Sequence, residues 1–248
     1  MKQSGLGDQL YVGAFNIAGD VGSVDRIGGG PQLLDVTGIN ASVLQRIATY
    51  RDASIEFTSF FNDAADGAHS ALKGLPSTDV GVTYVRGSTL GNPCATLTAK
   101  QMNYDGTRGN DGSLTFKVQA MNASVGLEWG NLLTVGTART DTTGTNPATG
   151  IDDLAGTPTS TNFGASIWVH LLTFSGTSVT FTLRDSADNS TFAAVAGGAS
   201  TAMTAVGYQR WVTGSTQNIR RYLSIGTSGT FTNAVFLCGV TRHLTATL

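Results

Sequence analysis

The residue types that most often carry catalysis or bind metals are few in this sequence and widely separated. The three histidines are His69, His170 and His243, and none has a second His or Cys at zinc-site spacing. His69 is interpreted as a helix-surface residue and His170 as a structural residue in a strand. The motifs G-x-S-x-G, Walker A and H-E-x-x-H do not occur. The sequence therefore predicts no catalytic residues, no metal, no cofactor and no enzyme activity.

Two acidic turns contain oxygen ligands of the kind that bind calcium. They are DGTRGNDG, residues 105–112, and DSADNS, residues 185–190. Neither matches an EF-hand loop, and local hydrogen bonds from Asp and Asn to the backbone explain both. Arg220 and Arg221, with Trp211 upstream, are of types that bind sugars or nucleic acids. Arginines in strands more often pair with carboxylates.

The chain is poor in charge. Only 13% of its residues are charged, its net charge is −2 and its pI is near 5.8, whereas soluble domains usually carry about 25%. This balance gives no basic surface for nucleic acid. Apolar runs are far shorter than the roughly 20 residues of a membrane-spanning helix, so no membrane insertion is expected. A surface with so little charge is often buried against other subunits.

The cysteines and the N-terminus point to a reducing compartment. Cys94 and Cys238 are far apart and are expected to be buried free thiols in different domains. The N-terminal MKQSGLGDQLYVG has one Lys and no apolar core, so it predicts no signal peptide and synthesis in the cytoplasm.

Alternation of apolar and polar residues predicts strands in the first half. It is clear in SIEFTSF, residues 54–60, in DVGVTYV, residues 79–85, and in SLTFKVQA, residues 113–120. Residues 94–121 read as a hairpin whose turn is YDGTRGNDGS, residues 104–113. Any binding surface in this half of the chain would therefore be formed by side chains on these strands.

Two short helices are expected. Residues 66–76 begin with Asp66 as N-cap and end with Gly74 and Pro76 as stop signals. Residues 40–50, NASVLQRIATY, have capping-box spacing and an apolar side. This second segment lies in a connection far longer than the two to five residues that neighbouring antiparallel strands need. It has no evident role within its own subunit.

A second segment without an evident role is GDVGSVDRIGGGP, residues 19–31. No helix follows its glycines, so it is not a phosphate-binding loop. It predicts a bend or the tip of an extended arm. Further on, residues 134–164 are rich in Thr, Gly and Pro and are typical of a linker with extended loops. Five or more short strands with regular turns follow and suggest a β-sandwich.

The residues of these motifs and their order along the chain resemble those of the major tail tube proteins of long, non-contractile-tailed bacteriophages of the siphophage type. The motifs are LDVTG, RDASIEFTSFFN, DGAHSALKGLP and VGVTYVRG, with LGDQLYVGAFNIAGDVGSVDRIGGGP before them and AKQMNYDGTRGNDGSLTFKVQA after. The resemblance covers roughly residues 1–130. SVTFTLRDSADNSTFAAV and RRYLSIGTSGTF resemble the outer β-sandwich domain of some of these proteins.

The resemblance implies a mainly β fold, with a tail tube domain in residues 1–131 made of two packed antiparallel sheets and a flanking short helix. Residues 132–158 would be linker and loops, and residues 159–248 an outer β-sandwich. It further implies a structural virion protein that stacks as rings, usually of six, into a tube for double-stranded DNA. Its partners would be its own copies and the tail terminator, tape measure and tail-tip proteins. It would lie in the virion tail after assembly in the bacterial cytoplasm.

The two unexplained segments would then contact neighbouring subunits or rings, through a heterologous contact that repeats into a filament. The residues expected at such contacts are Asp20, Val21, Val24, Ile27, Gly29, Pro31, Ile39, Val43, Leu44 and Ile47.

The lumen wall should not hold DNA, because a ring of cations would bind phosphates through counterion release. The residues expected to face the lumen are Ser54, Glu56, Thr58, Thr96, Thr98, Thr115 and Gln119. Lys100 and Lys117 depart from this pattern. Either they pair with acids such as Glu56, or these strands face outward.

The alternative is a carbohydrate-binding or adhesive β-sandwich protein. It would be a monomer with measurable glycan affinity. Within the tail tube interpretation, the outer domain would either brace the tube or contact host surface glycans weakly through exposed aromatics such as Trp168 or Trp211. The competing interpretation places both tryptophans in the core of the sandwich.

Overall fold

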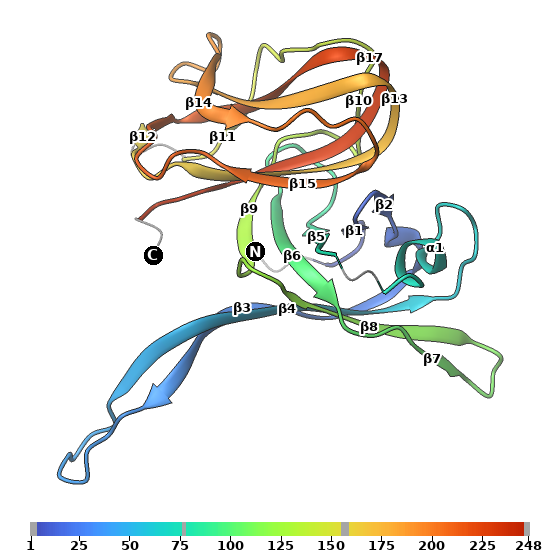
Figure 1. The fold of residues 1–248 in the computed structure, drawn as a ribbon, viewed down its shortest axis with the longest axis vertical. Coiled ribbons are helices and arrows are strands. Elements are labelled where there is room, and N and C mark those ends of the chain that lie inside the picture. The colour runs from blue at the N-terminus through green and yellow to red at the C-terminus, as the bar shows by residue number, and fades with distance from the viewer. Residues whose placement is uncertain (1–3, 76–77, 155–158, 246–248) are drawn as a thin grey trace. The chain divides into compact units, whose positions relative to one another are not determined.

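The computed structural model describes residues 4–75, 78–154 and 159–245. The fold is mainly β and its sheets are antiparallel, as the sequence predicts (Figure 1). The chain forms two compact units. Unit 1 contains Met1–Gly19, Thr83–Thr96 and Trp129–Leu248, and unit 2 contains Asp20–Val82 and Leu97–Glu128. The units therefore interleave along the chain, while the division at residues 131 and 158 stays a prediction.

Two long strands organise unit 1. β13 (Ala165–Ser186) pairs with β17 (Tyr222–Arg242) over almost its whole length. β15 (Gly207–Val212) pairs with the first part of β13, and β14 (Ala193–Ala199) pairs with its last part. The remaining elements are β1 (Gln9–Val12), β2 (Phe15–Asn16), η1 (Ala18–Asp20), β10 (Arg139–Asp141), β11 (Ile151–Asp152), β12 (Ser160–Thr161) and β16 (Ile219–Arg220).

The β13–β17 ribbon bends so that its two halves pack face to face. The register is irregular around Gly176, which has φ +154° and lies so close to Phe231 that a Cβ would come within 2.4 Å of the Phe231 Cα. Phe181 from the second half of β13 packs on Phe236, with ring centroids 4.7 Å apart, although Phe236 pairs with Leu171 in the first half. Segments predicted as separate short strands are thus joined by a glycine bend.

Residues 133–154, within the segment predicted as linker and loops, contain two short strands, β10 and β11. β10 and β11 both pair with β17, so this segment adds to the sheet of unit 1. Cys94 and Cys238 are buried free thiols, as predicted. Both lie in unit 1, which corrects the expectation that they belong to different domains.

Unit 2 is built around β3 (Val21–Asp35), β4 (Arg46–Phe60), β7 (Asp105–Arg108) and β8 (Leu114–Asn122). β4 pairs with β3 on one side and with β8 on the other, and β7 pairs with the start of β8. β5 (Val80–Val85), β6 (Pro93–Gln101) and β9 (Glu128–Leu132) give residues to both units. The end of β6 pairs with β8.

The short helix α1 (Ala68–Leu72) forms where the sequence predicts a helix, but its start is held differently. Asp66 does not cap it. Instead the Asp20 carboxylate accepts a hydrogen bond from the Ala68 N–H at 2.8 Å and another from the Asn62 amide at 2.9 Å. Ala68 and Leu72 are buried. The predicted stop signal Pro76 lies outside the described residues.

Three local predictions in unit 2 are wrong in the same way, because each missed a strand. Residues 46–50 belong to β4 and residues 40–45 are turns and bends, so no helix forms at 40–50. Gly28–Pro31 continue β3 instead of forming a bend or a tip. The turn predicted at 104–113 contains β7. In each case pairing with a neighbouring strand overrides the local sequence signal.

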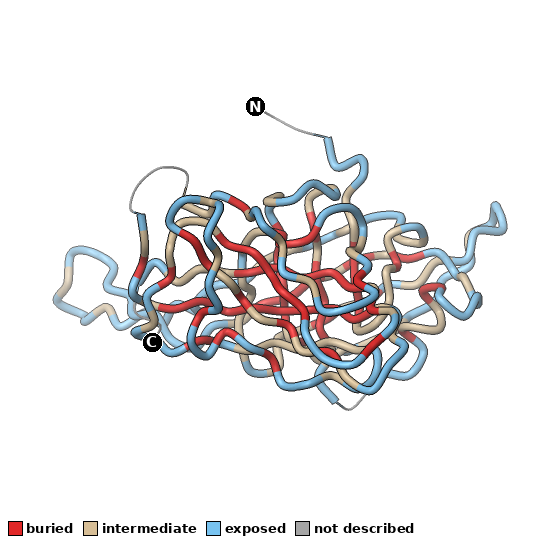
Figure 2. The backbone as a smooth tube through the Cα atoms, turned by 90° about the horizontal axis from the view of Figure 1, so that it is seen from above, coloured by how far each residue is buried: buried red, intermediate tan, exposed pale blue. Residues whose placement is uncertain are grey.

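Buried residues follow the long strands, and exposed residues lie mostly in the loops and projecting ends (Figure 2). Among the helices that the structure describes, none is long and apolar enough to cross a membrane.

Candidate assembly surface

The feature of unit 2 that most needs a partner is a two-stranded arm. We define the arm as residues 31–50, the outer part of the β3–β4 hairpin. β8 pairs with β4 only from Ser54 onward, so β4 has β3 as its only described strand neighbour between Arg46 and Ala53. At about 3.3 Å per residue this stretch is about 25 Å long. Figure 1 shows the arm extending from one end of the β3–β4–β8 sheet.

The arm exposes apolar side chains on both of its faces. Leu34 pairs with Ile47, and Leu33 pairs with Ala48 on the opposite face. Val43 is 72% exposed and Leu44 is 60% exposed. The exposed large apolar residues of the arm are Leu33, Leu34, Val36, Ile39, Val43, Leu44, Ile47 and Tyr50. An isolated two-stranded ribbon is marginal in water, and the described residues leave these side chains exposed.

Sequence reasoning identified four of these residues, Ile39, Val43, Leu44 and Ile47, but it missed the others. Leu33 and Leu34 were overlooked because their segment, LLDVT, was interpreted only as a strand, and Tyr50 because residues 40–50 were interpreted as a helix. The signal that would have found them is IATY, a second β-rich segment that follows the strand-like LLDVT after a turn and can pair with it as a hairpin.

The tip of the arm is closed by a small hydrogen-bond network. The Asp35 carboxylate accepts bonds from the Thr37 N–H at 2.9 Å and from its hydroxyl at 2.5 Å. The Gln45 N–H donates to Thr37 Oγ1 at 2.9 Å, and the Val36 N–H donates to the Gln45 carbonyl. The bonds from Thr37 lower the pKa of Asp35. LDVTG therefore encodes a preformed tip.

The predicted contact residues at the base of the arm have other surroundings. Val24 pairs with Phe57 and Ile27 with Ile55, and both are half-buried on the apolar side of the sheet, as is Val21. Gly29 lies against Ala53, where a Cβ would come within 2.7 Å of the Ala53 Cβ. The Asp20 carboxylate is occupied by Asn62 and α1. We therefore take the residues of the arm as the candidate contact residues and omit Asp20.

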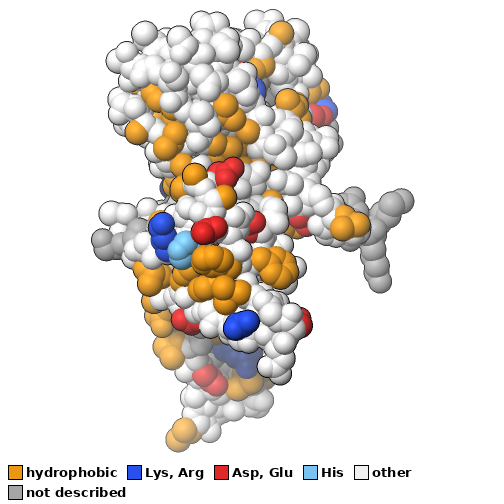
Figure 3. All heavy atoms as spheres, turned by 90° about the vertical axis from the view of Figure 1, so that its right-hand side faces the viewer, with side chains coloured by type: hydrophobic (Ala, Val, Ile, Leu, Met, Phe, Trp, Pro, Cys, Tyr) orange, Lys and Arg blue, Asp and Glu red, His pale blue; other side chains and the backbone are white. Residues whose placement is uncertain are grey.

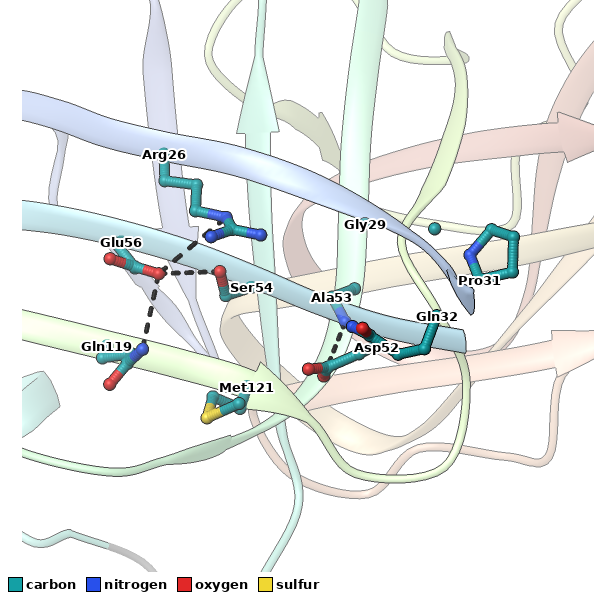
Figure 4. Close-up of a pocket in the computed structure, with 11 residues that line it drawn as sticks. Arg26, Gly29, Pro31, Gln32, Asp52, Ala53, Ser54, Glu56, Gln119 and Met121 are labelled. Atoms are coloured by element: carbon teal, nitrogen blue, oxygen red, sulfur yellow. Dashed lines mark hydrogen bonds and ion pairs between the residues drawn. The ribbon is translucent and has the colours of Figure 1, made fainter. Parts of the chain in front are cut away.

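The other face of the sheet in unit 2 is polar and is centred on Glu56 (Figure 4). Glu56 Oε1 accepts hydrogen bonds from the Ser54 hydroxyl at 2.8 Å and from the Gln119 amide at 3.4 Å. It lies 4.0 Å from Arg26 Nε. These residues line a shallow depression of about 250 Å³ with Gly29, Gly30, Pro31, Gln32, Asp52, Ala53 and Met121.

Most of the residues predicted to face a lumen share this polar face. Thr58 pairs with Lys117, Glu56 with Gln119 and Phe60 with Thr115, and directly opposed residues lie on one face. Thr98 belongs to the same face, because it lies two residues before Lys100, which pairs with Met121.

Thr96 is different. Its side chain is 1% exposed and its hydroxyl lies 2.8 Å from that of Thr83 in unit 1. A side chain enclosed in this way cannot line an open channel, so Thr96 is left out of the lumen-facing set.

The two lysines of this face have different surroundings. Lys100 forms an ion pair with Asp79 at 2.6 Å and does not pair with Glu56. Lys117 is exposed and makes no ion pair among the described residues. The face therefore carries mixed charges and no cluster of unpaired cations.

His170 in unit 1 is a fully enclosed titratable group in a strand, as predicted, and both of its ring nitrogens are hydrogen-bonded. Its Nδ1 lies 2.6 Å from the Gly13 carbonyl, which can only accept, so Nδ1 carries the proton. Nε2 then accepts from the Thr83 hydroxyl at 2.8 Å, and Thr83 accepts from Thr96. Burial lowers the pKa of His170 to about 4, although the bond to Gly13 opposes the shift. The sequence did not predict this hydrogen-bond chain.

The other chemistry-bearing residues of unit 1 have structural roles. Arg220 pairs with Asp185 at 2.7 Å, and Arg221 forms an ion pair with Asp152, which confirms the carboxylate interpretation. Asp188 accepts the Ser190 and Thr191 N–H groups, as turn chemistry predicts. Within the described ranges no group of three or more His, Cys, Asp or Glu side chains is placed to hold a metal ion.

Of the tryptophans proposed for glycan contact, Trp168 belongs to the core of unit 1 and Trp211 packs against it. Trp168 is 0% exposed. Trp211 packs against the core cluster and donates its indole N–H to the Gly198 carbonyl at 3.0 Å. Trp168 is therefore not available for glycan contact by the outer domain, whereas Trp211 keeps part of its surface exposed.

Comparisons with known proteins give no family. No family model matches the sequence, and no curated protein matches it. Among solved structures, a chain from the virion of a native gene transfer agent particle aligns with 52% of this chain and 98% of its own length, at 14% identity and a TM-score of 0.42. The Dit protein of SPP1, described as a paradigm of the hub adsorption apparatus in phages that infect Gram-positive bacteria, aligns with 95% of this chain and 99% of its own, at 12% identity and a TM-score of 0.32. Likenesses this distant carry no argument for function.

Proposed function

We propose that this chain is a structural protein of a phage-type tail, which assembles with copies of itself into stacked rings around a channel for DNA. The observation that carries the proposal is the arm, with apolar side chains exposed on both faces and a preformed tip. The ring number of six, the DNA cargo and the tail terminator, tape measure and tail-tip partners come from the sequence resemblance alone. The location in a virion tail has the same basis.

The arm supports assembly on energetic grounds. Burying one Leu, Ile or Val side chain stabilises a contact by roughly 1.5–3 kcal/mol. The eight exposed apolar residues of the arm supply enough burial to offset part of the entropy lost on association. Between residues 36 and 50 the only charged residue is Arg46, so few charges would have to be desolvated.

The polar face supports the channel. It presents Thr58, Thr98, Thr115 and Gln119 around Glu56, with Arg26 beside the carboxylate, whereas Ser54 is buried beneath Glu56 and is left out of the lumen-facing set as Thr96 is. Such a wall offers hydroxyl and amide groups with nearly balanced charge, which gives little counterion release on contact with DNA. We propose that this face lines the lumen.

Electron microscopy of the purified protein at high and low concentration tests the proposal. The wild type is expected to form rings or tubes with a central hole, and Leu44→Asp/Ile47→Asp is expected to remain folded but to lose them. Val206→Asp is a matched control, because Val206 is an exposed apolar residue in unit 1. It should assemble as the wild type does.

Two outcomes contradict the proposal. One is a wild type that stays a small monodisperse particle at every concentration and also in the presence of tail-tip proteins. The other is normal tube yield from Leu44→Asp/Ile47→Asp, which would show that the arm is not a contact. Circular dichroism of each variant separates loss of assembly from loss of folding.

A further inference from the structure

A second exposed apolar surface lies in unit 2. Phe61, His69, Tyr104 and Phe116 form an aromatic cluster, in which the Tyr104 and Phe116 rings stack with centroids 4.2 Å apart. Phe61 lies 4.8 Å from His69 and 5.8 Å from Phe116, centroid to centroid. Phe61 is 40% exposed and the neighbouring Leu114 is 38% exposed. We call these five residues the aromatic patch.

Hydrogen bonds and close ring contacts hold the side chains of the aromatic patch in place. His69 Nδ1 lies 3.2 Å from the Tyr104 hydroxyl, and the Phe61 N–H donates to the Leu114 carbonyl at 3.0 Å. Gly106 pairs with Phe116, whose ring covers it so closely that a Cβ would come within 2.8 Å. Figure 3 shows hydrophobic side chains gathered beside an imidazole on this side of the molecule.

The arm and the aromatic patch lie at opposite ends of the same strand. The arm contains the start of β4 at Arg46, whereas Phe61 directly follows its end at Phe60, where β4 pairs with the start of β8. Fourteen residues of extended strand span about 46 Å. Figure 1 shows the arm at one end of the sheet and α1 and β7 at the other. An arm therefore cannot fold back onto the patch of its own subunit.

The two surfaces are complementary in charge. The loop after Phe61 carries Asp63 and Asp66, which are exposed and make no ion pair among the described residues. The arm carries one cation, Arg46, which is exposed, and one anion, Asp35, which lies opposite Arg46 in the strand register. The Asp35 carboxylate accepts hydrogen bonds from Thr37, and Arg46 makes no ion pair among the described residues. The exposed Arg46 guanidinium on the apolar arm thus matches an apolar patch with a negative rim.

We propose that the aromatic patch receives the arm of a second copy of this chain, with Arg46 set against Asp63 and Asp66. This inference rests on the proposed function and names the receiving surface. Because donor and acceptor are different surfaces at opposite ends of unit 2, the contact is heterologous and repeats in one direction. It covers the apolar side chains of the arm and of the aromatic patch with one interaction.

Mixing two defective variants tests the proposal. Leu44→Asp/Ile47→Asp has a damaged arm and an intact patch, whereas Phe61→Asp/Leu114→Asp has an intact arm and a damaged patch. Neither should form tubes alone. When they are mixed, one intact arm meets one intact patch, so analytical ultracentrifugation should show a species of about twice the mass of either variant. Normal tubes from the patch variant, or no larger species on mixing two folded variants, would overturn the proposal.

Charge reversal gives an independent test if the patch variant does not fold. Arg46→Glu alone and Asp63→Arg/Asp66→Arg alone should each weaken assembly by about tenfold or more in critical concentration, and the three changes in one chain should restore it. If the combined variant instead shows the sum of the two losses in assembly, the proposed pairing of Arg46 with Asp63 and Asp66 is wrong. If the wild type itself does not assemble, the proposed function fails. If only the patch variants assemble normally, this inference fails and the proposed function stands.

Discussion

At the scale of single residues, His170 makes the stability of unit 1 depend on pH. Its pKa is about 4 in the folded chain, and an unperturbed imidazole has a pKa near 6.5. Between these values the unfolded chain binds a proton that the folded chain does not, so the free energy of unfolding falls as the pH falls from 6.5 to 4. The expected loss is about 3 kcal/mol. Denaturant unfolding at several pH values measures it.

The matched variant for this prediction is His170→Gln, because Gln does not titrate and its amide can still donate to the Gly13 carbonyl. Carboxylates also titrate in this range, so the informative quantity is the difference in pH dependence between the wild type and the variant. The variant should be less stable at pH 7 and should lose less stability on acidification. Equal pH dependence of the two proteins would show that the buried imidazole does not titrate as described.

At the scale of elements, the start of α1 depends on a residue far away in sequence. Asp20→Ala removes the acceptor of the Ala68 N–H and of the Asn62 amide, and is expected to destabilise unit 2 by about 1–3 kcal/mol. Asp66→Ala is the matched control. Asp66 is the N-cap that the sequence suggests, but the structure gives it no capping bond, so its removal should cost less than about 0.5 kcal/mol. The reverse order in denaturant unfolding would contradict the observed cap.

Some of the strands could be predicted from the sequence, and others could not. Residues 54–60 and 113–120 were predicted as strands because their alternation reports one buried face, and Ile55, Phe57 and Val118 are buried there. Residues 40–50 were misinterpreted because apolar residues three and four apart fit a helix as well as the tip and flank of a hairpin. The deciding interactions are the bonds between β3 and β4, such as the Leu34–Ile47 pair. Those bonds join segments that local patterns treat separately.

At the scale of the whole molecule, the candidate surfaces could be predicted only in part. The polar face followed from alternation along each strand. The sequence could not show that β6 passes from unit 1 into unit 2 between Thr96 and Leu97, so it could not show that Thr96 is enclosed in unit 1. The aromatic patch was not predicted, because Phe61, His69, Tyr104 and Phe116 come from four separate segments. Only the pairing of β7 and β4 with β8 brings these rings together.

The charge of the polar face yields the last prediction, which concerns assembled tubes. If this face lines the lumen, Glu56→Lys places a cation there on every subunit, beside Arg26 and Lys117. Tubes of this variant should retain short linear DNA in a co-sedimentation assay at about 50 mM salt and release it at about 200 mM, because binding through counterion release weakens steeply with salt. Ser215→Lys/Thr216→Lys adds the same net charge at exposed positions of unit 1. Equal retention of DNA by these two variants would place the polar face outside the channel, whereas retention by the Glu56 variant alone would place it inside.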